Sequence, residues 1–309
     1  MKLSFVIPCY RSECSLSYVV NEIHNKMHER TNLDYEIILV NDCSPDGVQA
    51  VIERLCAESP ATVHCIELAR NFGQHAAILA GYHYVTGDVV YAVDDDGQAP
   101  IESTFNLLDK LEEGYDIVWG SYVQKKHSFF RNIGSYINGW MAEKLIGKPH
   151  GLQVTSFRVT RRFVIDEAIR YEGAYPYLLG LLLRSTKRVA NVPVEHRARK
   201  EGRSGYTLSK LFGLWMNGFT AFSVEPLRLA TWGGFACSGI GFLAMLFVIV
   251  RKLLNPNVAL GYSSLMAVIL FVGGVQMMMM GMLGEYIGRI YICQNKAPQF
   301  VIRKKIGLE

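Results

Sequence analysis

Three consecutive acids, Asp94, Asp95 and Asp96, follow the apolar run 89–93. Carboxylates gathered at the end of a buried strand repel one another and lose hydration, so a nearby cation is needed to keep them ionised. Hard carboxylate oxygens on a turn suit Mg²⁺ or Mn²⁺, which in enzymes commonly join carboxylates to the phosphates of a substrate. A solvated acidic turn is the alternative for three acids taken alone. The run therefore indicates a site for a divalent cation or a plain acidic turn.

Strands and helices alternate in the first half of the chain and must position these acids. This order predicts an α/β fold with a mostly parallel sheet that helices cover on both faces. Ligands of such sheets bind beyond the carboxyl ends of the strands, which is where the acids lie. The turn 41–47 lies there too, and either offers backbone N–H groups to a ligand or caps a helix through Asp46. The expected strands are 3–7, 36–40, 64–68, 89–93 and 116–119, and the expected helices are 15–29, 48–58 and 76–85.

Two uncharged runs, 229–250 and 258–284, dominate the second half of the chain. At a helical rise of about 1.5 Å per residue, each can cross a hydrocarbon core about 30 Å thick. Neither run shows the polar stripe of a helix in a soluble bundle. We therefore expect a membrane segment at 226–287 with two transmembrane helices, at about 229–250 and 260–284. Asn-Pro-Asn at 255–257 is a turn signal, so the two helices are expected to form a tight hairpin.

The charges around this hairpin predict its orientation. Five basic residues follow the second helix and only Arg251 and Lys252 lie in the connecting loop, which places both termini in the cytoplasm. The expected organisation is a cytosolic domain at 1–205, an amphipathic juxtamembrane segment at 206–225 and a cytosolic basic tail at 288–309. The five basic residues are Arg289, Lys296, Arg303, Lys304 and Lys305.

Composition and charge exclude several classes of protein. The formal net charge is +4, and no basic block interleaved with aromatic residues suggests a nucleic-acid partner. The seven cysteines form no CxxC pair, so we expect reduced thiols in a cytosolic domain and no zinc site. The sequence RARKEGRSG at 197–205 is basic and lies just before the membrane segment. Its arginines are expected either to attract anionic lipid or to clamp the phosphate of a lipid-linked substrate.

Five sequence elements, in order, resemble the polyprenyl-phosphate branch of glycosyltransferase family 2 over nearly the whole chain. FVIPCY resembles the opening strand and loop of that family, VNDCSPDG its nucleotide-base turn, and NFGQHAAILAGYHYVTGD the segment before its metal motif. VDDDGQAPIE matches the pattern DADLQxPPE, from which Asp95 and Gly97 depart. GMLGEYIGRIY is similar to the exit of the second span in bacterial undecaprenyl-phosphate sugar transferases, especially those that load a modified arabinose or a glucose.

The resemblance implies a GT-A fold, a nucleotide-sugar donor, Mg²⁺ or Mn²⁺, and inverting transfer onto a polyprenyl (undecaprenyl) phosphate at the inner membrane. The product would be a lipid-linked monosaccharide for cell-envelope glycans. Asp94, Asp96 and Gln98 take the catalytic positions, with the metal on the two acids. The nucleotide-sugar positions are Pro8, Tyr10, Asp42 and Asp95. The acceptor-phosphate positions, in an element that matches RxxGxSxY, are Arg199, Arg203, Ser204 and Tyr206.

One position departs from the family in a way that concerns the mechanism. Several relatives carry an Asp, proposed as a general base, immediately before a Phe-Arg dipeptide, whereas Ser156 stands at this position here. A serine hydroxyl does not accept a proton at neutral pH. The acceptor is a phosphate monoester whose second pKa is about 6, so it arrives largely as an anion and scarcely needs a base. We expect the loss of the carboxylate to cost little activity.

Two other functions and two arrangements of the hairpin remain open at this level. A processive polysaccharide synthase shares the fold, but two membrane helices are too few to form a channel from a single chain. A non-catalytic membrane subunit that binds nucleotide-sugar has no need for a metal at the leaving group. Gly284 and Gly288 have GxxxG spacing, which favours either close packing within the hairpin or a homo-oligomer; we expect the latter.

Overall fold

The computed structural model describes residues 1–122, 143, 147–174, 176–195, 225–254, 261–295 and 297–308. The chain divides into two compact units. The first unit combines Met1–Asn217 with Lys296–Glu309 and contains the β-sheet, and the second is Gly218–Asn295. The chain therefore leaves the first unit, forms the second, and returns.

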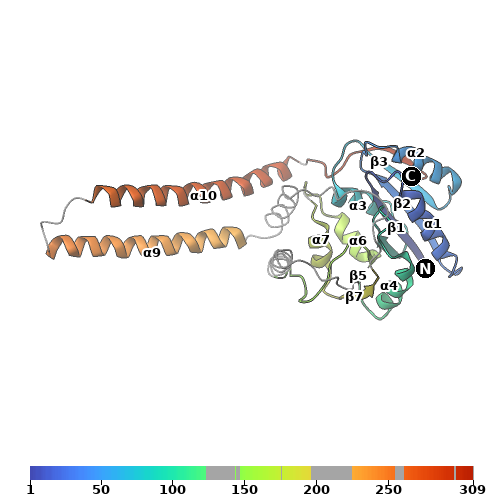
Figure 1. Cartoon of the computed structure of the whole chain (residues 1–309), viewed down its shortest axis with the longest axis horizontal. Coiled ribbons are helices and arrows are strands. Elements are labelled where there is room, and N and C mark those ends of the chain that lie inside the picture. Colours follow the sequence, from blue (N-terminus) through green and yellow to red (C-terminus); the bar gives the residue numbers. More distant parts are fainter. Residues whose placement is uncertain are drawn as a thin grey trace. The chain divides into compact units, whose positions relative to one another are not determined.

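A mixed sheet of eight strands organises the first unit, in the order β7-β5-β6-β4-β1-β2-β3-β8 (Figure 1). Strands β1 to β4 pair in parallel, as do β5 and β7, whereas β6 is antiparallel to β4 and β5, and β8 is antiparallel to β3. The five predicted strands are confirmed, and β6, β7 and β8 are additional. The bounds are β1 Lys2–Cys9, β2 Asp34–Asn41, β3 Val63–Leu68, β4 Val89–Ala92, β5 Ile117–Tyr122, β6 Arg158–Arg161, β7 Val189–Val194 and β8 Ile302–Ile306.

Helices cover both faces of this sheet, as predicted (Figure 1). Alternate residues of a strand point to opposite faces, so Phe5 and Ile7 of β1 face one helical layer and Val6 faces the other. The larger apolar cluster lies beneath the first layer, where Leu16, Ile52 and Leu107 are buried. The first layer is α1 Leu16–Met27, α2 Val48–Glu58 and α4 Thr104–Glu112, with a 3-10 turn at Ile101–Ser103; the second is α3 Gln74–Tyr82, α6 Arg162–Ile169 and α7 Leu178–Ser185.

Helix α3 packs against β1 and β2 closely enough to require a glycine. A Cβ atom placed on Gly81 would overlap Cγ1 of Val6 and lie 3.1 Å from Cγ2 of Val40. The side chains of these core strands are rigid at χ1, so they cannot easily make room. This close packing fixes the N-terminal end of α3, with Gln74 and His75, near the carboxyl ends of the central strands.

A buried carboxylate ties the amino ends of β1, β2 and β4 together. Glu36 accepts hydrogen bonds from Ser4 Oγ at 2.6 Å and from both the N–H and the hydroxyl of Thr86 at 2.6 Å, and it pairs with Lys2 Nζ at 2.7 Å. Burial raises the pKa of Glu36, but the bonds from Lys2, Ser4 and Thr86 outweigh it and lower the pKa from 4.5 to about 2. The ionised form therefore stabilises the folded protein.

Replacing Glu36 with Gln is expected to lower the free energy of unfolding at pH 7 by about 1–3 kcal/mol, the usual value of hydrogen bonds to a charged group. Since the folded pKa is depressed, the stabilisation is present above about pH 4.5 and is lost as the pH falls toward 2. Unfolding midpoints measured from pH 7 down to about pH 3 should show the two proteins converging. Glu29→Gln, which breaks the exposed pair with Lys26, is the control and should change stability by less than about 1 kcal/mol at every pH.

The strand β8 lies within the predicted basic tail and completes the edge of the sheet beside β3. Cys65 is aligned with Ile306, and Glu67 with Lys304. Lys304 Nζ lies 2.7 Å from Glu53 Oε1 on α2, so the strand is also joined to a helix. Basic side chains on an edge strand discourage further pairing with other chains. Three basic residues of the predicted tail, Arg303, Lys304 and Lys305, therefore lie in a β-strand.

The second unit contains two long helices that contact each other, α9 Glu225–Leu254 and α10 Tyr262–Gln294. Large apolar side chains are exposed along both, including Trp232, Phe242 and Phe271. Among the residues that the structure describes, no helix combines the length and the apolar character that crossing a membrane requires. The two predicted spans are thus not confirmed, and the predicted turn 255–257 and segment 206–224 lie outside the described residues.

Candidate active site

The three acids follow β4 at the carboxyl edge of the central strands, and their carboxylates are held in different directions. Gln74 Nε2 donates to Asp94 Oδ1 at 2.8 Å. The backbone N–H of Tyr10 donates to Asp95 Oδ2 at 2.9 Å. The backbone N–H of Gln98 donates to Asp96 Oδ1 at 3.0 Å. The cluster is therefore joined to α3, to the loop after β1 and to its own turn.

Negative charge accumulates at this edge. Burial raises the pKa of Asp95 to about 6, and the charges of Asp94 and Asp96 add to the rise, against hydrogen bonds from Ser12 and the Tyr10 N–H. The pKa of Tyr122, at the end of β5, is raised to about 12 by burial and by Asp94 and Asp96. Burial is the main cause of both shifts, and the smaller contributions from Asp94 and Asp96 have the sign that a nearby cation would offset.

The acids can supply some, but not all, of the ligands that a divalent cation needs. The described residues contain no group of three or more His, Cys, Asp or Glu side chains arranged to hold a metal ion. Mg²⁺, however, is commonly bound by one or two carboxylates together with water and substrate phosphates. The negative potential around Asp95 and the oxygen ligands of Asp94 and Asp96 suit that mode of binding. The sequence-based assignment of the metal to these two residues stays a prediction.

Asp42, at the end of β2, holds the loop that leads into α3. Its two carboxylate oxygens accept the backbone N–H groups of Phe72, at 2.7 Å, and Gly73, at 2.8 Å. The pKa of Asp42 is raised, because burial raises it more than these two bonds lower it. The carboxylate thus anchors the loop before Gln74, and its predicted contact with the nucleotide remains a prediction.

The loops after β1 and β2 are interlocked and contain strained backbone. Arg11 and Cys43 have positive φ angles of 58° and 49°, which are unusual for residues other than glycine. The N–H of Arg11 donates to Ser44 Oγ at 2.7 Å, and Asp46 accepts from Ser44 and from the N–H of Glu13. Gly47 occupies the N-cap position of α2, but Asp46 Oδ1 also accepts the N–H of Val48 at 3.4 Å, so Asp46 joins the two loops and the first turn of α2. Sequence patterns gave no sign of these contacts.

Of the two residues predicted to contact the nucleotide from the first loop, only Tyr10 is accessible. Pro8 is buried within β1, in register with Val40. Tyr10 is 42% exposed, and the guanidinium carbon of Arg11 lies over its ring, 5.5 Å from the centroid. Tyr10 therefore offers an aromatic face to a ligand, and Pro8 fixes the strand that presents it. The predicted acceptor-phosphate residues, Arg199, Arg203, Ser204 and Tyr206, lie outside the described residues.

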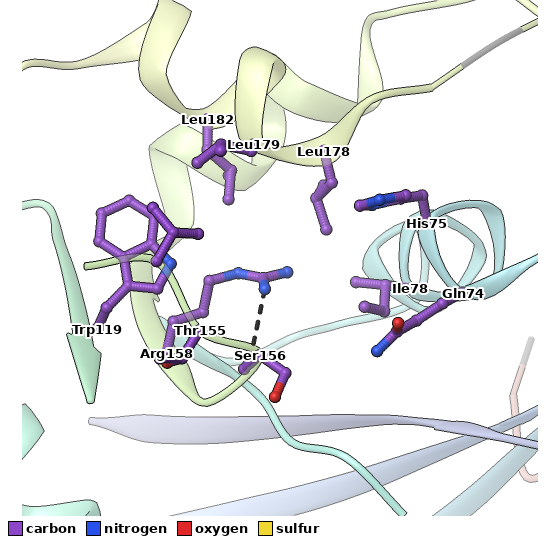
Figure 2. A pocket seen from close by; sticks show the side chains of 11 residues that line it. Gln74, His75, Ile78, Trp119, Thr155, Ser156, Arg158, Leu178, Leu179 and Leu182 are labelled. Carbon is purple, nitrogen blue, oxygen red and sulfur yellow. Dashed lines mark hydrogen bonds between the residues drawn. The ribbon is translucent and has the colours of Figure 1, made fainter. Parts of the chain in front are cut away.

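A cavity of about 200 Å³ lies beside α3, and Figure 2 shows the side chains that line it. Gln74 lines this cavity and also binds Asp94, so the two features are contiguous. Ser156, which stands where relatives carry the proposed base, lines it as well, and its backbone carbonyl accepts a 3.5 Å hydrogen bond from Arg158 Nη1. Sequence reasoning missed the cavity, which also includes His75 and Trp119, because α3, β5, β6 and α7 supply its walls from distant parts of the chain.

Two family models match the chain. Residues 4–168 match Glycosyl transferase family 2, and residues 225–290 match the GtrB C-terminal hairpin. The chain belongs to glycosyltransferase family 2. It is therefore a glycosyltransferase, and the family resemblance drawn from its motifs is confirmed.

Two relatives match this chain along its entire length. It is 34% identical, over all of this chain and 94% of the other, to an undecaprenyl-phosphate 4-deoxy-4-formamido-L-arabinose transferase of Yersinia enterocolitica. It is 31% identical, over all of this chain and 95% of the other, to the uncharacterized glycosyltransferase YkcC of Bacillus subtilis. Both relatives thus share the second unit as well as the sheet.

A solved structure supports the assignment of the fold. Glucosyl-3-phosphoglycerate synthase from Mycobacterium tuberculosis, determined with Mn²⁺, UDP-glucose and phosphoglyceric acid, aligns with a TM-score of 0.53 and 17% identity. The alignment covers 72% of this chain and 78% of that chain. At this identity the likeness concerns the fold alone, which is a GT-A-like α/β fold with a mixed sheet.

Proposed function

We propose that this glycosyltransferase moves a sugar from a nucleotide-sugar to a polyprenyl phosphate and produces a lipid-linked monosaccharide for cell-envelope glycans. The observation that carries the proposal is the full-length match to an undecaprenyl-phosphate sugar transferase, which includes both the domain with the acid cluster and the helical hairpin. The acid cluster at the carboxyl edge of the sheet is suited to a diphosphate with a divalent cation.

Asp94 and Asp96 would hold Mg²⁺ or Mn²⁺, and Gln74 would orient Asp94 through its 2.8 Å hydrogen bond. The cation would supply Lewis-acid stabilisation of the charge that builds on the leaving diphosphate. Asp95 acts differently, because its carboxylate accepts the N–H of Tyr10 and so fixes the loop that presents the Tyr10 ring. Tyr10 and Asp42 would bind the nucleotide, with Gln98 beside the diphosphate.

The acceptor phosphate is itself the nucleophile in this proposal. One of its oxygens attacks the anomeric carbon from the face opposite the leaving group, which inverts the configuration of that carbon. Ser156 cannot serve as a base, and none is needed, since a phosphate monoester is largely dianionic above its second pKa of about 6. Arg199 and Arg203 would bind this phosphate and reduce its repulsion from the donor.

The hairpin 225–290 would insert in the inner membrane, with both termini in the cytoplasm. Support comes from its exposed apolar residues, which include Trp232 at 72% and Met277 at 72%, and from the match to the GtrB hairpin. An isolated pair of helices in water would not leave so many large apolar side chains uncovered. The lipid acceptor would then be in the same membrane as the hairpin.

We further propose that the hairpin helices associate between copies of the chain. A Cβ atom added to Gly284 or Gly288 of α10 meets no atom within 4 Å, so among the described residues nothing fills the space over these two glycines. Glycines at this spacing allow another helix to approach closely in a membrane. This arrangement favours a homo-oligomer over close packing within one hairpin.

Transfer to lipid tests the proposed function directly. The purified full-length protein in detergent would be mixed with undecaprenyl phosphate, Mg²⁺ or Mn²⁺, and each of a panel of radiolabelled UDP-, GDP- and dTDP-sugars. We expect one donor to give label in an organic extract, as a single-sugar product that requires the lipid. Polymer formation would instead indicate a processive synthase. No incorporation from any donor, with tight nucleotide-sugar binding retained, would indicate a non-catalytic subunit.

A further inference from the structure

The cavity beside the acids contains a buried arginine, Arg158, that forms no ion pair with any residue that the structure describes. Only 6% of Arg158 is exposed. Its Nη2 donates to Tyr82 Oη at 3.0 Å and its Nη1 to the Ser156 carbonyl at 3.5 Å, both of which are neutral acceptors. Its Nε has no hydrogen-bond partner among the described residues. The guanidinium is thus held in place without being neutralised.

The neighbouring arginines show that this arrangement is particular to Arg158. Arg161 Nε lies 3.8 Å from Asp116 Oδ1, and Arg162 Nε lies 2.7 Å from Asp166 Oδ1. Both of these arginines are more exposed than Arg158, yet both are paired with a carboxylate. Burying a cation without a counter-ion costs free energy, and a bound anion would reverse that cost.

A second donor lies in the same wall. The indole of Trp119 is fully buried, and its Nε1–H has no partner in the described part of the chain, although buried tryptophan N–H groups usually find one. Figure 2 shows this nitrogen on the side of the ring that faces Arg158, and the guanidinium reaching into the space between Trp119 and His75. Two unpaired N–H donors from different strands therefore converge on one space.

The remaining lining residues define what fits there. His75 is neutral at physiological pH, because burial and then the charge of Arg158 lower its pKa to about 4, so it adds no negative charge. Leu178, Leu179 and Leu182 of α7 form an apolar wall. The volume of about 200 Å³ is below the roughly 300–1,000 Å³ of pockets for whole cofactors or drugs, so it suits one group of a larger ligand.

We propose that this cavity binds an oxyanion of a substrate through the guanidinium of Arg158 and the indole N–H of Trp119. The proposal rests on the proposed function in one respect, namely that Gln74 joins the cavity to the acids where donor and acceptor would meet. The anion is either the carboxylate of an acidic donor sugar or the phosphate of the acceptor. Both present oxygen atoms that an arginine fork recognises well.

Small anions test the site without requiring catalysis. The full-length protein, labelled with ¹⁵N at its tryptophan indoles, would be titrated with glucuronate, with inorganic phosphate and with uncharged glucose. The Trp119 signal is assigned by its absence from Trp119→Phe. We expect one anion to shift that signal and glucose to leave it unchanged. A response to glucuronate assigns the cavity to an acidic donor sugar, and a response to phosphate assigns it to the acceptor.

Variants at the cavity separate binding from folding. Arg158→Met should weaken binding of the active anion by at least about tenfold, since it removes the charge. Trp119→Phe lacks the indole signal, so its binding is measured by calorimetric titration; it should retain the fold and weaken binding by severalfold, which keeps the test valid if Arg158→Met does not fold. Tyr82→Phe, which removes only an acceptor behind the guanidinium, should retain the binding. The proposal is overturned if neither anion shifts the Trp119 signal, or if Trp119→Phe and Arg158→Met bind as the unaltered protein does.

The result is independent of the transfer assay. Anion binding in a protein that transfers no sugar to lipid would leave this site in place and remove the proposed function. Active transfer with no response to either anion would support the proposed function and rule out the anion site.

Discussion

Replacing Asp96 with Asn should lower turnover by at least about a hundredfold, which is the usual effect of losing one electrostatic stabiliser of a transition state. Asp96 lies in the turn after β4, where burial, with a smaller contribution from the charges of Asp94 and Asp96, raises the pKa of Asp95 to about 6. The amide keeps the size of the side chain and removes the charge that a divalent cation would require. Initial rates of lipid-linked sugar formation, measured over a range of Mn²⁺ concentrations, give the comparison.

The matched control for this change is Asp109→Asn. Asp109 is an exposed acid on α4, in a pair with Arg30 at 3.1 Å, and its removal should leave turnover near that of the unaltered protein. Both proteins should also unfold at similar temperatures. Near-normal transfer by the Asp96 variant in excess Mn²⁺ would contradict the assignment of this acid to the metal.

Introducing arginine into both hairpin helices, as Phe242→Arg with Phe271→Arg, should release the protein from membranes. An arginine near the centre of a membrane helix costs about 2.5–3.5 kcal/mol for insertion, so the pair costs about 5–7 kcal/mol. Both phenylalanines are exposed on their helices, at 58% and 66%, so the change disturbs little packing within the unit. The fraction of protein that stays with membranes after an alkaline carbonate wash is the measurement.

Phe163→Arg on α6 provides the control for this experiment, because Phe163 is 49% exposed and belongs to the unit that contains the sheet. It should remain with membranes as the unaltered protein does. If the double variant also remained, or if the unaltered protein washed off, the proposed insertion of the hairpin would be wrong.

Strong local patterns explain which parts of the fold were predictable. Strands β1 to β4 are short apolar runs between turn residues, and their side chains are buried on both faces, which is the pattern of parallel strands. The three strands that were not predicted, β6, β7 and β8, lack that pattern. Strand β6 reads RVTR, β7 contains Pro193, and β8 reads IRKKI, which resembles a charged tail. Their identity as strands comes from pairing with distant segments.

Some residues of the candidate site were likewise predictable from local sequence, and others were not. The acids were predictable because three carboxylates beside an apolar run are an unusual local feature. Gln74, Trp119 and Arg158 were not, since each is an ordinary residue in its own segment and gains its meaning from neighbours across the sheet. Arg158 had one weak local sign, the Phe-Arg dipeptide shared with relatives. The orphaned donors of the cavity became visible only with the tertiary structure.

The position of β8 has a consequence for how the protein is made. The ribosome must deliver both long helices before it delivers the strand that pairs with β3, so the sheet remains unfinished while the hairpin emerges. During this interval the free side of β3 is open to pairing with other polypeptides, a known route to aggregation. Pairing of β8 with β3 then completes the sheet, so a complete sheet reports that the intervening helices have already been synthesised.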